Sequence, residues 1–205
     1  MTSSSLPPII GISVAVGDAW QEVPMGAGEG EPWAEELISS WAPDGLAAAS
    51  LREQLVRLQA NLSEQVGPGV TALVWVPTPA SGYCGGGLVA ANWPVGSSGV
   101  DDPAAAAALF GDGGFVEEGD TLLEQTLWSG EFPAGPYAAA HRVTTSPTAD
   151  EEAVVETVDF VVFPPGSSEF VHLSFTAESI SAFDDMPSQT RAVAQTLELT
   201  LGGGR

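Results

Sequence analysis

Apolar residues recur every three or four positions in two stretches of the chain, which is the spacing of an amphipathic helix. The first stripe lies in residues 31–45 and stops before a proline and a glycine. Its members are Trp33, Leu37 and Trp41. The second stripe has five members, Leu51, Leu55, Leu58, Leu62 and Val66. Ser50 and Glu53 have the spacing of a capping box, so we expect Ser50 to cap the second helix.

Alternating or continuous apolar runs predict strands in most of the remaining chain. Residues 154–175 predict two strands around a Pro-Pro-Gly turn, with alternate residues on the core face of each. Residues 70–76 are almost wholly apolar, which predicts a strand that is buried on both faces. Further strands are predicted in residues 9–16, 20–25, 88–95, 121–128 and 137–146.

The C-terminal part predicts a last helix. Asp184 or Asp185 is the expected cap, Pro187 lies in the first turn, and Val193 and Leu197 supply the buried positions. Strands joined by short turns, with helices between or beside them, predict an α+β fold in which helices flank an antiparallel sheet as an αβα sandwich. We expect one domain, residues 1–205, with Gly-rich loop insertions near 77–87 and 96–119.

Charge narrows the possible partners. The chain has 27 acidic residues against five arginines and no lysine, for a net charge of -22. Such a surface disfavours nucleic acids and anionic membranes, because both require cationic side chains. Either the composition of a GC-rich genome or selection for a basic protein partner explains the missing lysines. The first apolar run is too short for an export signal or a membrane span, so we expect a cytoplasmic protein.

Several segments together resemble the PsbP-like superfamily, mainly over the last 55 or so residues. These segments are WQEVP at Trp20–Pro24, VETVDFVVFPP and FVHLSFTA in the predicted hairpin, and FDDMPSQTRAVAQTLEL at the C-terminus. The resemblance implies an αβα arrangement on an antiparallel sheet and, for most members, a role in binding or assembly without catalysis. Secretion chaperones and lipoproteins are among those relatives. The resemblance supplies no catalytic residue.

Candidate chemistry is sparse. Cys84 could act as a nucleophile, with His141 or His172 as base and Asp159 as the orienting carboxylate. A small core or loop cysteine is the structural alternative. Neither histidine has a second ligand at metal-binding spacing, and the paired acids lack the alternating oxygens of a calcium loop, so we expect no metal and no cofactor.

Three functions follow from these observations. The first is a non-enzymatic acidic protein-binding module, an adaptor or chaperone-like protein linked to secretion or assembly of another protein. Trp33, Leu37 and Trp41 are its candidate contact residues, since tryptophan is enriched in binding hot spots, although the same stripe would also suit the core. The second is a hydrolase or transferase that uses Cys84. The third is a structural subunit of a homo-oligomer or larger particle.

Overall fold

A seven-stranded antiparallel sheet organises the protein. The computed structural model describes residues 6–65, 70–116, 119–147, 152–177 and 179–203. The strand order is β2-β3-β4-β8-β7-β6-β5, and every neighbouring pair is antiparallel. The strands are β2 (Trp20–Glu22), β3 (Thr71–Trp75), β4 (Gly86–Pro94), β5 (Thr121–Phe132), β6 (Gly135–Pro147), β7 (Glu152–Val162) and β8 (Glu169–Ala177).

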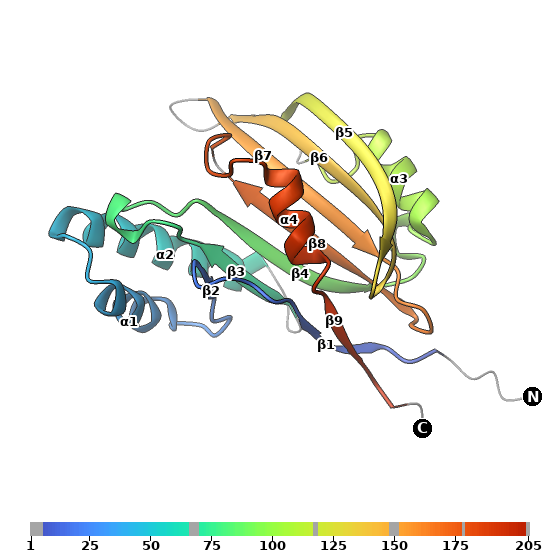
Figure 1. Ribbon diagram of the computed structural model, residues 1–205, viewed down its shortest axis with the longest axis horizontal. Helices are drawn as coiled ribbons and strands as arrows, with labels where there is room; N and C mark the ends of the chain where they lie inside the picture. The colour runs from blue at the N-terminus through green and yellow to red at the C-terminus, as the bar shows by residue number, and fades with distance from the viewer. Residues whose placement is uncertain (1–5, 66–69, 117–118, 148–151, 178, 204–205) are drawn as a thin grey trace, which may run out of the picture.

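One face of the sheet is covered by α4 (Met186–Ala194) and by a two-stranded sheet of β1 (Ile9–Ser13) and β9 (Glu198–Leu201) (Figure 1). The predicted last helix is therefore correct in position, but it ends at Ala194. Residues 198–201 form a strand instead, because they pair with β1 from the far end of the chain. That long-range pairing leaves no local signal in the sequence.

The other face is covered in two separate places. The helices α1 (Gly30–Trp41) and α2 (Gly45–Gln65) pack on β3, whereas α3 (Pro103–Gly111) packs on β6 and β5. These two helical layers lie at opposite ends of the sheet in Figure 1, with β4 and β8 between them. Helices on both faces make the αβα sandwich that the sequence predicts.

Strand β3 shows why its apolar run is nearly continuous. Leu73 packs in the core on the α4 side, while Ala72 and Val74 pack against α1 and α2 on the other side. Both faces of this strand are thus buried, as predicted. Within α2, Leu51 and Leu55 have no exposed surface, and Val66 of the predicted stripe lies outside the described residues.

The predicted cap of α2 is wrong. The helix begins at Gly45, and the Asp44 carboxylate accepts hydrogen bonds from the backbone N–H groups of Leu46 and Ala47 at 3.1 and 3.0 Å. Ser50 lies inside the helix. The alanines that precede Ser50 are strong helix formers, so the helix extends back to the first residue that can accept these bonds.

The two Gly-rich segments contain regular structure. The first includes the short 3₁₀ helix η1 (Pro79–Ser81), and the second includes η2 (Ser97–Gly99) and α3. Ala106 and Phe110 of α3 have no exposed surface and pack against strands β6 and β7. The second segment therefore contributes a helix to the αβα sandwich.

Candidate functional site

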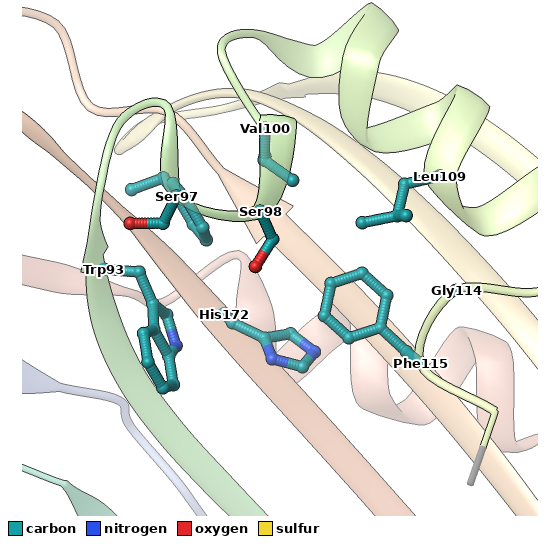
Figure 2. Close-up of a pocket in the computed structure, with 9 residues that line it drawn as sticks. Trp93, Ser97, Ser98, Val100, Leu109, Gly114, Phe115 and His172 are labelled. Atoms are coloured by element: carbon teal, nitrogen blue, oxygen red, sulfur yellow. The ribbon is translucent and has the colours of Figure 1, made fainter. Parts of the chain in front are cut away.

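A cavity of about 450 Å³ opens over β4 and β8, where the helical layers of α2 and α3 leave the sheet uncovered. Residues from both strands and from the 95–115 segment line it (Figure 2). The lining is mainly aromatic and aliphatic, with one imidazole and two hydroxyls: Trp93, Phe115, Phe170, Val100, Leu109, His172, Ser97 and Ser98. An apolar cavity with a few polar groups is the usual form of a ligand or side-chain binding site.

Two aromatic side chains flank the cavity and are exposed to solvent. Trp93 is 49% exposed and Phe115 is 39% exposed. Figure 2 shows His172 between them, with Ser98 above it. The Phe115 ring lies 4.8 Å from the His172 ring and 5.1 Å from the Phe110 ring, measured between centroids. These contacts hold Phe115 in a left-handed backbone conformation, with φ at 69°, which is costly for a residue other than glycine.

A tight turn forms the wall opposite Phe115. Gly96 and Gly99 have φ angles of 90° and 77°, which glycine adopts without steric cost. The backbone N–H of Gly96 donates to the carbonyl of Val100 at 2.9 Å, closing the turn. This closure turns the side chain of Val100 inward, where it is 1% exposed. The glycines in this part of the sequence therefore shape the cavity wall.

The floor of the cavity rests on a buried ionic network. The Asp159 carboxylate, on β7, accepts hydrogen bonds from the Arg142 guanidinium and from Nε2 of His172, the latter at 2.7 Å. Arg142 also donates from Nη1 to the carbonyl of Gly114 at 2.9 Å, and its guanidinium carbon lies 5.8 Å from the centre of the Phe110 ring. Arg142 and Asp159 are 2% and 1% exposed.

This network fixes the orientation of His172. A carboxylate only accepts hydrogen bonds, so Nε2 of His172 carries the hydrogen of this contact. The Arg142–Asp159 ion pair balances its own charge inside the protein. The same network ties Gly114, next to Phe115, to the sheet. The cavity therefore has a rigid floor and a polar group held in a fixed orientation.

The structure brings His172 and Asp159 together, but not with Cys84. The sulfur-bearing side chain packs against the core between α2 and β3, and the Cys84 N–H donates to Oε1 of Gln54 at 3.1 Å. Cys84 precedes β4, which begins at Gly86. His172 pairs with Ala91, which is five residues further along β4. At about 3.3 Å per residue, roughly 17 Å of strand separates the two sites. Within the described chain, no hydrogen bond joins His172 to Ser97 or Ser98 either.

The second histidine lies on the other face of the sheet. Nε2 of His141 is 2.8 Å from Oε1 of Glu156, and His141 lines a more open cavity of about 430 Å³ beneath α4. Tyr137 also lines that cavity. Its hydroxyl is buried and has no hydrogen-bond partner in the part of the chain that the structure describes. Arg191 of α4 is exposed at the same place.

Trp33, Leu37 and Trp41 are half-buried on α1 and pack against the core beneath that helix. The buried residues of α1 are Gly30, Ala34 and Ile38, and the last two each lie one position beyond a member of the predicted stripe. Part of each side chain in the predicted stripe therefore remains accessible. Their role as partner contacts stays a prediction.

Within residues 6–65, 70–116, 119–147, 152–177 and 179–203, no group of three or more Cys, His, Asp or Glu side chains is arranged to hold a metal ion. No helix in these ranges has the length and apolar character needed to cross a membrane.

Sequence reasoning named Asp159 and His172 but missed Arg142 and both flanking aromatics. One signal for the buried pair was available. Asp159 lies between Val158 and Phe160, and Val161 follows it on the same face of the strand. Because both faces of this strand are apolar, an acid in this position requires a buried partner. The partner lies on another strand, so the sequence alone does not identify it.

No protein-family model and no curated relative matches this sequence. Solved structures are related to it distantly in fold. One is a protein of Bacteroides thetaiotaomicron VPI-5482, with 11% identity and a TM-score of 0.44; the match covers 96% of this chain and 49% of that protein, so this chain spans about half its length. Another is LpqN of Mycobacterium tuberculosis, involved in cell envelope biogenesis, with 11% identity, a TM-score of 0.36, and coverage of 92% and 83%. Neither relation assigns a family, and the PsbP-like resemblance stays a prediction.

Proposed function

We propose that this chain is a non-enzymatic, acidic protein-binding module, an adaptor or chaperone-like protein that receives an apolar side chain of a basic partner in the cavity beside Trp93 and Phe115. The observation that carries the proposal is the pair of exposed aromatic side chains at a cavity of about 450 Å³. Exposed aromatic residues next to a cavity are typical of binding hot spots, where they exclude water around an anchor from the partner.

Charge around the cavity supports a basic partner. Asp101 directly follows Val100 of the lining, and Asp112 lies three residues before Phe115; both acids are exposed. Arg142, which lies beneath the cavity, is buried and paired with Asp159. A segment with an apolar anchor flanked by lysine or arginine would therefore meet complementary charge at the rim, in addition to the attraction of the net charge of -22.

The location of Cys84 favours binding over cysteine chemistry. A cysteine nucleophile requires a base within hydrogen-bond reach, about 3 Å. The strand separation of roughly 17 Å between the Cys84 end of β4 and His172 is several times that distance. The His172–Asp159–Arg142 network serves the binding function by holding the imidazole of His172 in one orientation at the bottom of the cavity.

The test begins with gentle purification of the tagged full-length protein from its native cells, followed by identification of the bound partner. Affinity is then measured by calorimetry for the wild type, Trp93→Ala and Phe115→Ala. Each variant should bind at least tenfold more weakly, since truncating a hot-spot residue typically costs about 2 kcal/mol or more. Raising the salt concentration should weaken wild-type binding, because salt screens attraction between exposed charges.

Leu46→Ala is the matched control. Leu46 is 88% exposed and lies in the first turn of α2. Its neighbour Ala47 packs near Gly82, which precedes β4, whereas the cavity is at the other end of that strand. Its truncation should leave affinity unchanged. Equal losses in Trp93→Ala and Leu46→Ala, or a partner that binds without a preference for low salt, would contradict the proposal. A mass measurement of the purified protein separates this function from a homo-oligomeric structural subunit.

A further inference from the structure

Strand β5 forms a long open edge of the main sheet (Figure 1). It runs over 12 residues, Thr121–Phe132, and among the residues that the structure describes its only partner in the sheet is β6. The opposite edge, β2, has three residues. A sheet edge presents unpaired backbone N–H and C=O groups, and proteins usually protect it by keeping the strand short, as β2 is.

The protection of so long an edge is only partial in β5, which has two charged residues and one irregularity in its pairing. Lysine and proline are the common protecting residues, yet the chain has no lysine and β5 has neither proline nor arginine. One irregularity in pairing lies between Leu122 and Glu124, and the register is continuous from Glu124 to Phe132. Leu123 and Leu127 are 58% and 41% exposed along this edge. An exposed, apolar edge of this length is suited to pairing with another strand.

The charges on β5 indicate which strand it pairs with. Its two charged residues are Glu124 and Glu131, and both are exposed. A second copy of this chain would bring its own acidic edge and a further net charge of -22, which opposes self-association. A basic segment would instead gain opposite-charge pairs across the strands.

We propose that β5 accepts an extended segment of another protein as an eighth strand, and that this segment carries both apolar and basic residues. An apolar residue of the segment lies beside Leu127, and lysine or arginine lies beside Glu124 and Glu131. Backbone hydrogen bonds fix the segment, and these side chains select it. The surface is separate from the cavity over β4 and β8, with β7 and β6 between them, so this inference and the proposed function can fail independently.

The experiment measures backbone amide hydrogen exchange of the full-length protein with a blocked nine-residue peptide of valine and threonine that has two lysines seven positions apart, so that the lysines lie beside Glu124 and Glu131 and a valine lies beside Leu127. Alternate amides between residues 124 and 132 should exchange at least tenfold more slowly at saturating peptide, because they gain hydrogen bonds. The control peptide has the same side chains and charge but carries N-methyl groups on its three central amides. It should give no protection. Equal protection by both peptides, or binding without protection of β5, overturns the proposal.

Variants separate strand pairing from simple charge attraction. Leu127→Lys places a cation on the edge and should weaken peptide binding at least tenfold. Leu46→Lys adds the same charge on α2, at a residue that is 88% exposed, and should have little effect. If both variants weakened peptide binding equally, net charge alone would explain the binding and the proposal would be overturned. Trp93→Ala should leave peptide binding unchanged, which distinguishes this edge from the cavity.

The mass of the protein alone in solution tests whether a second copy of this chain occupies the β5 edge instead. A monomer at micromolar concentration, with the outward amides of β5 in fast exchange, is the expected result. A dimer in which these amides are already protected would mean that a second copy occupies the edge, and it would overturn the assignment to a basic segment.

Discussion

Replacing Asp159 by asparagine tests the buried network most severely. The substitution keeps the size of the side chain and removes its charge, which leaves the Arg142 guanidinium buried at 2% exposure without its counter-charge. Removing one member of a buried ion pair typically costs about 3–5 kcal/mol. Such a loss is a large part of the roughly 5–15 kcal/mol that stabilises a typical domain. For a chain of this size it corresponds to a fall in Tm of about 6–20 °C.

Urea unfolding followed by circular dichroism measures this loss. Removing both charges, as Arg142→Met with Asp159→Leu, should cost less than Asp159→Asn alone, because no buried charge is left uncompensated. Glu131→Gln is the matched control: it makes the same change at an exposed acid and should shift stability by less than about 0.5 kcal/mol. A loss below about 1 kcal/mol in Asp159→Asn would refute the argument, since it would mean that water solvates the network.

Three smaller perturbations follow from local features. Tyr137→Phe should leave Tm equal or higher by calorimetry, because the hydroxyl it removes is buried without a partner among the described residues; a clear fall would reveal a hydrogen bond there. Ala42→Gly should stabilise the protein by up to about 1 kcal/mol in urea unfolding, since Ala42 ends α1 with φ at 47°, and a loss of stability would show that the left-handed conformation is not strained. The backbone N–H of Ser188 donates to the Asp185 carboxylate and holds the pKa of that carboxyl below its ordinary value of 3.8. The carboxylate therefore stabilises the folded protein above pH 3.8, and this stabilisation is lost as the pH falls through the lower pKa of the folded state. Urea titrations of wild type and Asp185→Ala should accordingly differ by a constant amount above about pH 5 and converge in stronger acid, and a difference that grows in acid would contradict this sign.

Local patterns in the sequence predicted the fold class well. The helical stripes of α1 and α2 and the alternation in β7 and β8 each reflect burial of one side of an element, which a periodic pattern records directly. The start of α2 was misplaced because two capping signals compete. Asp44 and Ser50 both suit an N-cap, and helix propensity of the intervening alanines decides for Asp44.

The site was only partly predictable, because its residues meet through tertiary structure. Trp93 and His172 come together through the pairing of β4 with β8, while Phe115 arrives from the segment after α3. Asp159 was recognisable as a buried acid, but its partner Arg142 is on β6 and is found only from strand register. Cys84 stands out in the sequence because glycines follow it. In the structure the last two of these glycines begin β4, and Cys84 packs against α2.

The most direct test of the central claim is site-specific photo-crosslinking at the cavity in intact cells. Phe115 is replaced by p-benzoylphenylalanine in the full-length protein, and Leu46, which is 88% exposed on α2, is replaced in the same way as the control. The cavity account predicts that a basic protein is crosslinked from position 115, through an apolar residue next to lysine or arginine, and not from position 46. A complex that forms normally but is crosslinked from position 46 and not from position 115 would contradict it.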